Sequence, residues 1–89
     1  MKECTINHVK MQEIYRCIGK NVKRIRTEKG VTQLALSLAI GHSAVGTISL
    51  CELGIQKKHF NIEHLMKIAE VLDVDICEFF EECSNEENI

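Results

Sequence analysis

Apolar residues recur every three to four positions along most of this chain, which is the spacing of one buried face of an α-helix. The pattern predicts a first amphipathic helix over about residues 11–29, ended by Gly30, and a later helix over residues 61–72 with Asn61 as its N-cap. The apolar stripes of these two helices are the candidate core. They consist of Met11, Ile14, Ile18, Val22 and Ile25 in the first helix and Leu65, Ile68, Ala69 and Leu72 in the later one.

Two shorter helices are predicted between them, in the segment TQLALSLAIGHSAVGTISLCELG at residues 32–54. Thr32 caps the first, Gly41 lies in the turn, and the second begins between residues 43 and 45 and ends at Gly54. Two short helices around a glycine turn are typical of a helix-turn-helix, whose second helix enters the major groove of DNA.

A fifth helix is predicted after Asp75, which forms a capping-box pattern with Glu78. The predicted organisation is an N-terminal extension at residues 1–10, a helix-turn-helix domain at 11–82 with its motif at 32–54, and an acidic disordered tail at 83–89. Hydrophobic residues make up 45% of the chain and proline is absent, which favours a single all-α domain over a sheet.

The net charge of −2 conceals a strong asymmetry along the chain. Residues 1–69 hold all eleven Lys and Arg with five acidic residues, whereas residues 70–89 hold eight acidic residues and no base. A basic body with an acidic end is a hint of nucleic-acid contact, and a solvated surface with a disordered terminus is the alternative.

Cysteine and histidine positions give no sign of a metal site or of catalysis. The five cysteines are Cys4, Cys17, Cys51, Cys77 and Cys83, an odd number without CxxC spacing, and we expect them to be reduced. Cys17, Cys51 and Cys77 are predicted to face inward, and a redox switch at Cys4 or Cys83 is the alternative use of a thiol.

Cys4 and His8 are spaced like half a zinc site, but no second pair follows at the required spacing, so no metal is expected. No nucleophile motif or phosphate-binding glycine loop occurs, so we expect no enzyme activity and no cofactor. No apolar run approaches about 18 residues and the N-terminus lacks a signal-peptide stretch, which predicts a cytoplasmic protein without a membrane span.

Over roughly residues 18–80 the chain resembles the Xre-like family of phage repressor and Cro-type helix-turn-helix domains. The resemblance is carried by IGKNVKRIRTEKGVTQ, by Ile48, Ser49, Glu52 and Gly54, and by NIEHLMKIAEVLDVDICEFF. It implies a five-helix repressor-like fold and a sequence-specific duplex DNA-binding transcriptional regulator, a repressor that acts as a dimer.

The resemblance also implies roles for individual residues. Gln33 would reach a DNA phosphate, and Arg26 would pair with Glu52 beneath the recognition helix. Base readout would fall to Ala44, Val45, Gly46, Thr47, Ser49 and Leu50. Phosphate contacts would come from His42 in the turn and from the flanks of the groove, that is from Lys20, Lys23, Lys57, Lys58 and His59. Ser43 is also expected to contact DNA.

The readout positions contain no Arg, Lys, Asn or Gln, the side chains that make bidentate contacts with guanine and adenine. We therefore expect modest specificity that leans towards A·T pairs and is assisted by DNA shape.

Two further expectations concern protein contacts. Leu34 and Leu38 are predicted to point away from the core, covered either by residues 1–10 or by another chain, so the alternative function is a protein-interaction module of antitoxin or anti-repressor type. Ile76, Phe79 and Phe80 are predicted to form a dimer seam, although the same side chains could instead close the core within one chain.

Overall fold

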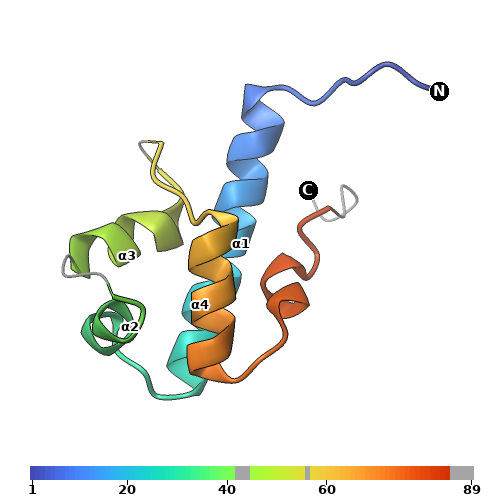
Figure 1. Cartoon of the computed structure of the whole chain (residues 1–89). Coiled ribbons are helices and arrows are strands. Elements are labelled where there is room, and N and C mark those ends of the chain that lie inside the picture. Colours follow the sequence, from blue (N-terminus) through green and yellow to red (C-terminus); the bar gives the residue numbers. More distant parts are fainter. Residues whose placement is uncertain (42–44, 56, 85–89) are drawn as a thin grey trace.

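A computed structural model describes residues 1–41, 45–55 and 57–84 of the chain (Figure 1). These residues form four α-helices, α1 (His8–Glu28), α2 (Gln33–Ala39), α3 (Val45–Leu53) and α4 (Ile62–Leu72), and a short 3₁₀-helix, η1 (Ile76–Phe80), with no strand among them. The all-α class predicted from the sequence is confirmed, but the fifth helix is one 3₁₀ segment rather than an α-helix. No helix in the described ranges is long and apolar enough to cross a membrane.

Side-chain caps fix where the helices begin. The Thr32 hydroxyl accepts a hydrogen bond from the Ala35 N–H (3.0 Å), and the Asn61 side chain accepts one from the His64 N–H (2.7 Å). Both of these caps were predicted.

The predicted start of the first helix was wrong by one turn. Asn7 accepts a hydrogen bond from the Lys10 N–H (2.9 Å), so α1 begins at His8, inside the predicted extension. The apolar periodicity begins only at Met11, and the pattern therefore gave no signal for this first turn.

The core lies where α1 meets the other elements. α2 and α3 lie on one side of α1 and η1 on the other, with α4 between them in this view (Figure 1). The buried apolar side chains come from every element and are Ile18, Val22, Ile25, Leu36, Ile40, Ile48, Cys51, Phe60, Leu65, Ile68, Ala69, Leu72 and Phe79. The predicted apolar stripe of α4 is buried as expected. Of the α1 stripe only the C-terminal part, Ile18, Val22 and Ile25, is buried.

The C-terminal end of α3 is pressed against α1. A Cβ atom at Gly19 would lie 2.7 Å from the carbonyl oxygen of Cys51 and closer still to that of Glu52, so only glycine permits this approach. Gly54 ends α3 with φ +63° and its carbonyl accepts a hydrogen bond from the Gln12 side chain (3.3 Å). The backbone contact at Gly19 and Gly54 therefore sets the position of α3 relative to α1.

The predicted dimer seam is only partly available at the surface. Phe79 is fully buried inside the chain, because η1 inserts it between α1 and α4, and so it cannot form a seam. Ile76 is half-buried against the same core, and Phe80 remains 39% exposed.

The cysteines also differ from expectation. Cys17 of α1 is joined to Cys83 by a disulfide across 66 residues, which overturns the prediction of reduced thiols and of an inward-facing free Cys17. Cys77 is exposed rather than inward, because η1 turns Phe79 to the core instead. Cys51 is buried as predicted, and burial raises the pKa of its thiol.

The disulfide also changes the predicted boundary of the tail at residue 83. Cys83 is half-buried and packs against the core, while residues 85–89 of the predicted disordered tail lie outside the described residues. Among the described residues no three His, Cys, Asp or Glu side chains gather as a metal site would require.

Candidate nucleic-acid interface

The candidate interface is the outer face of α3. Ile48, Cys51 and Glu52 point inward, with at most 3% of each residue exposed. The opposite face presents Gly46 and Leu53, both exposed, and Thr47, Ser49 and Leu50, each half-buried. Val45 is the first residue of α3, and the predicted contacts His42, Ser43 and Ala44 lie outside the described residues. The predicted readout residues Gly46, Thr47, Ser49 and Leu50 therefore share one face of α3. Leu53, which was not predicted, lies on the same face.

A buried polar network ties α3 to α1 and α2. The Arg26 guanidinium donates to both carboxylate oxygens of Glu52, Nε to Oε2 (2.7 Å) and Nη2 to Oε1 (3.1 Å), and a third donor reaches the Val31 carbonyl (2.8 Å). The side chains of Arg26 and Glu52 are only 8% and 2% exposed. The ion pair implied by the family resemblance is thus present, in the bidentate geometry that gives Arg–carboxylate pairs directional strength.

Gln33 completes this network, a role that the sequence did not predict. Its side-chain amide donates to Glu52 Oε1 (2.9 Å) from the first turn of α2, so this amide is engaged inside the motif. The residue type alone did not distinguish an amide that contacts phosphate from one that supports α3. The arrangement holds α2 and α3 in a fixed relation before any DNA is bound.

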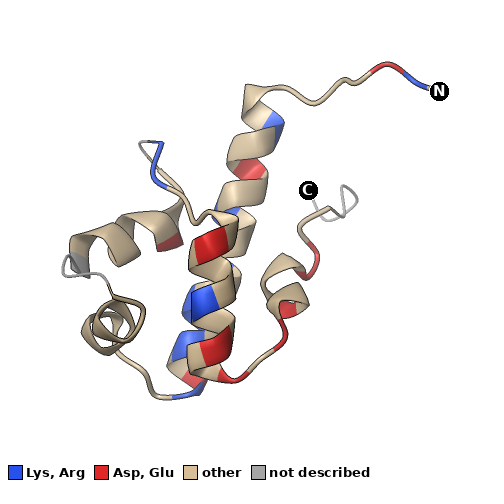
Figure 2. Ribbon diagram, in the orientation of Figure 1, with Lys and Arg blue, Asp and Glu red and all other residues tan. Residues whose placement is uncertain are grey.

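The face formed by α2 and α3 carries almost no charge. Between Lys29 and Lys57 the only Asp, Glu, Lys or Arg is Glu52, and it is buried against Arg26. Figure 2 shows α2 entirely tan and α3 nearly so, whereas α1 and α4 carry both blue and red segments. Contacts made by this face are therefore limited to hydroxyl, backbone and apolar groups.

Positive charge lies at two edges of this face. A groove of about 500 Å³ between α1 and α3 places Lys20, Lys23 and Arg24 beside Leu53. Lys57 and Lys58, both exposed, lie in the loop that follows α3, and Figure 2 shows this loop, partly blue, projecting above α3. Basic side chains at both edges, with an uncharged strip between them, suit a DNA duplex whose phosphates flank its groove.

The loop after α3 is anchored by an unpredicted aromatic contact. The His59 ring stacks on the Tyr15 ring of α1, with centroids 3.7 Å apart and planes 6° from parallel. His59, expected at a phosphate, is therefore half-buried and positions Lys57 and Lys58 instead. No local pattern signals a contact between residues so far apart in sequence.

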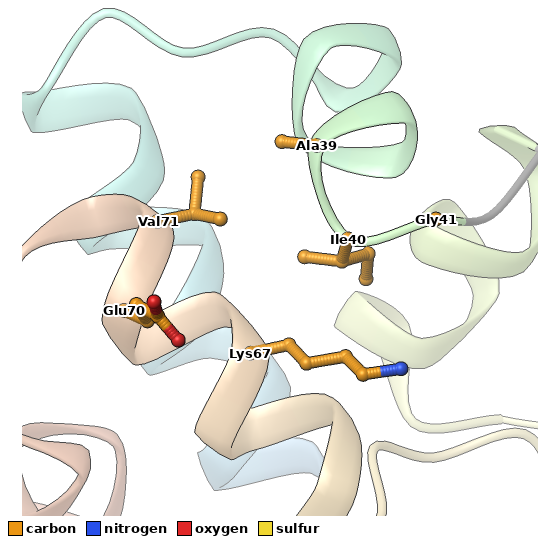
Figure 3. A pocket seen from close by; sticks show the side chains of 6 residues that line it. All are labelled: Ala39, Ile40, Gly41, Lys67, Glu70 and Val71. Atoms are coloured by element: carbon orange, nitrogen blue, oxygen red, sulfur yellow. The ribbon is translucent and has the colours of Figure 1, made fainter.

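The predicted outward leucines of α2 are exposed, Leu34 by 54% and Leu38 by 64%. Residues 1–7 are exposed and extend away from α2 (Figure 1), so they do not cover these side chains. On the α4 side of α2 a groove of about 530 Å³ lies between the two helices. Figure 3 shows Ala39, Ile40 and Val71 facing it, with Lys67 and Glu70 on the α4 side.

Comparison with known proteins agrees with this geometry. A model of the helix-turn-helix family matches residues 22–79, which is more than half of the chain and runs from the middle of α1 into η1. Comparison with curated proteins gives no match to this chain.

Proposed function

Because the chain belongs to the Xre/Cro-like helix-turn-helix family of DNA-binding regulators, we propose that it is a sequence-specific duplex DNA-binding repressor of transcription that acts as a dimer in the cytoplasm. One observation carries the proposal: the outer face of α3 is uncharged and is flanked by Lys and Arg side chains. The helix itself is held in place by the buried Arg26–Glu52 pair. A recognition helix held in this way loses little conformational freedom on binding.

In this proposal α3 lies in the major groove and the edges of the face hold the phosphates. Lys20 and Lys23 contact one strand and Lys57 and Lys58 the other, while Thr47 and Ser49 donate or accept single hydrogen bonds at base edges. Leu50 packs on thymine methyl groups. The outcome is binding dominated by backbone contacts, with modest preference for A·T-containing sites.

A dimer doubles the small readout surface of one chain across two half-sites. Phe80 and the exposed part of Ile76 are the side chains of η1 that remain for such a seam once Phe79 is placed in the core.

The test is the salt dependence of binding to a mixed-sequence duplex, measured by fluorescence anisotropy. Lys58→Gln is expected to weaken binding to all sequences alike and to reduce the slope of log K against log salt by about 1 for each replaced phosphate contact. Lys67→Gln on α4, where the lysine pairs with Glu63 (3.0 Å) and lies in neither basic edge of the interface, is the matched control and should leave the slope unchanged. Equal slopes for both variants would contradict the proposed interface.

The exposure of Leu34 and Leu38 favours a second candidate function, a protein-interaction module of antitoxin or anti-repressor type. The side chains lie one turn apart and would give a partner helix an apolar contact. Co-purification from the native cell followed by mass spectrometry tests this function. A stoichiometric partner that is lost in Leu34→Ser/Leu38→Ser supports it, and its absence excludes it.

A further inference from the structure

The segment that follows η1 is fastened to one face of α1 at three successive points. Cys83 is bonded to Cys17, the Asn21 side chain donates to the carbonyl oxygens of Phe79 (2.9 Å) and Glu81 (3.1 Å), and Arg24 Nη2 lies 3.6 Å from Glu81 Oε2. The three anchoring residues of α1 follow one another at about one-turn spacing, and the attached segment therefore runs along the helix.

This attachment sets acidic residues against a basic helix face. Glu81 and Glu82 belong to the attached segment and Glu78 to η1 just before it, and Figure 2 shows the acidic run that leads from the end of α4 through η1. Arg24, which Glu81 pairs with, also lines the groove that holds Lys20 and Lys23 beside α3. The disulfide thus keeps carboxylates next to a positive edge of the candidate nucleic-acid interface.

The backbone next to the bond is held in an unfavourable conformation. Glu82 has φ +63°, in the left-handed region that non-glycine residues rarely adopt, and it directly precedes Cys83. Such a residue persists when its surroundings hold it, and here the adjacent anchors are the disulfide and the Asn21 hydrogen bond to Glu81. Opening the bond lets Glu82 relax, which favours release of the segment.

We propose that the Cys17–Cys83 bond is a reversible clasp that holds the acidic segment on α1 when oxidised and increases DNA affinity when it is reduced. This inference rests on the proposed function. A DNA-binding regulator works in a compartment that keeps thiols reduced, where a disulfide acts as a transient, redox-sensing bond rather than a permanent one.

The chemistry is thiol–disulfide exchange with a low-molecular-weight disulfide such as glutathione disulfide. One cysteine thiolate attacks a sulfur of that disulfide, which forms a mixed disulfide and releases one glutathione thiolate. The second cysteine thiolate then attacks the protein sulfur of the mixed disulfide, closes the Cys17–Cys83 bond and releases the second glutathione. The two protein thiols lose two protons and two electrons in all, and glutathione disulfide becomes two glutathione thiols. Reduction is the reverse.

The expected size of the effect follows from Arg24. Reduction removes the Glu81 partner and leaves Arg24 with only its exposed pair to Glu28 (3.3 Å). If Arg24 then contacts a phosphate, the salt slope steepens by about 0.9 and binding tightens about eightfold at roughly 0.1 M salt.

The experiment measures duplex binding by the whole chain at a series of glutathione redox poises, with the bond quantified by mass spectrometry of alkylated protein. Reduced wild type and Cys83→Ser are expected to bind about eightfold more tightly than oxidised wild type. Oxidised Glu81→Gln should recover part of that difference, because it removes one of the two carboxylates that pair with Arg24, the other being Glu28, while the bond stays closed. Cys77→Ser, which removes an exposed thiol outside the bond, is the control and should behave as wild type.

Hydrogen exchange of the Phe80–Cys83 amides provides a readout that needs no DNA. Faster exchange in the reduced wild type supports the clasp, and unchanged exchange overturns it. Equal affinity of the oxidised and reduced forms overturns the inference while leaving the proposed function intact. Absence of duplex binding by either form overturns the proposed function and the regulatory role of the bond together.

Discussion

Replacing Glu52 with alanine tests the network that holds the recognition helix. The substitution removes the acceptor of two Arg26 hydrogen bonds, at 2.7 and 3.1 Å, and of the Gln33 bond at 2.9 Å. It leaves a guanidinium only 8% exposed without its carboxylate, so the loss is the cost of an uncompensated buried charge. That cost is about 3–5 kcal/mol, a large share of the roughly 5–15 kcal/mol that stabilises a small domain.

Thermal denaturation followed by circular dichroism measures this loss. A domain of this length loses roughly 4–8 °C of melting temperature per kcal/mol, so the variant should melt at least about 12 °C below wild type. Glu28→Ala is the matched control, because Glu28 pairs with Arg24 at 3.3 Å while the two side chains are 60% and 46% exposed. An exposed pair of this kind contributes at most about 0.5 kcal/mol.

A double variant separates the cost of the unpaired buried charge from the loss of side-chain packing. Arg26→Met with Glu52→Leu removes both charges and keeps apolar volume, so it should recover much of the stability that Glu52→Ala loses. If Glu52→Ala loses no more than Glu28→Ala, the reasoning about a buried pair is refuted.

Local signals in the sequence predicted most of the fold. Thr32, Asn61 and Asp75 are cap residues whose bonding partners lie two or three positions away, so the sequence contains the whole interaction. The apolar stripe of α4 could likewise be predicted from its own periodicity, without knowing which elements it packs against. The start of α1 was missed because its cap, Asn7, precedes the periodic run.

Contacts between distant residues could not be predicted in the same way. The Cys17–Cys83 bond, the Tyr15–His59 stack and the hydrogen bonds of Asn21 join residues more than forty positions apart, and each depends on where whole helices come to lie. The Arg26–Glu52 pair was expected only because the family resemblance supplied the missing geometry.

Three further predictions concern packing, reactivity and assembly. Gly19→Ala should destabilise the domain by about 1–3 kcal/mol, because its Cβ meets the α3 backbone. Gly46→Ala, with open space around it in α3, should instead stabilise it by up to about 1 kcal/mol, and similar denaturation midpoints for the two variants would contradict the packing. The Cys51 thiol, with its pKa raised by burial, should react with iodoacetamide more slowly than the exposed Cys4 thiol, and equal rates would show that Cys51 is accessible. Phe80→Glu should give a folded monomer by sedimentation, whereas an unfolded product or an intact dimer would exclude Phe80 from the seam.

The most direct test of the central claim is selection from random duplexes with the purified, reduced protein. The winning sequence and a scrambled control are then titrated at several salt concentrations. We expect an enriched, A·T-containing inverted repeat that is bound at least about 10³-fold more tightly than the scrambled duplex. No enrichment, with only weak and salt-sensitive binding, would contradict sequence-specific recognition by α3 and would favour the exposed leucines of α2 as the functional surface.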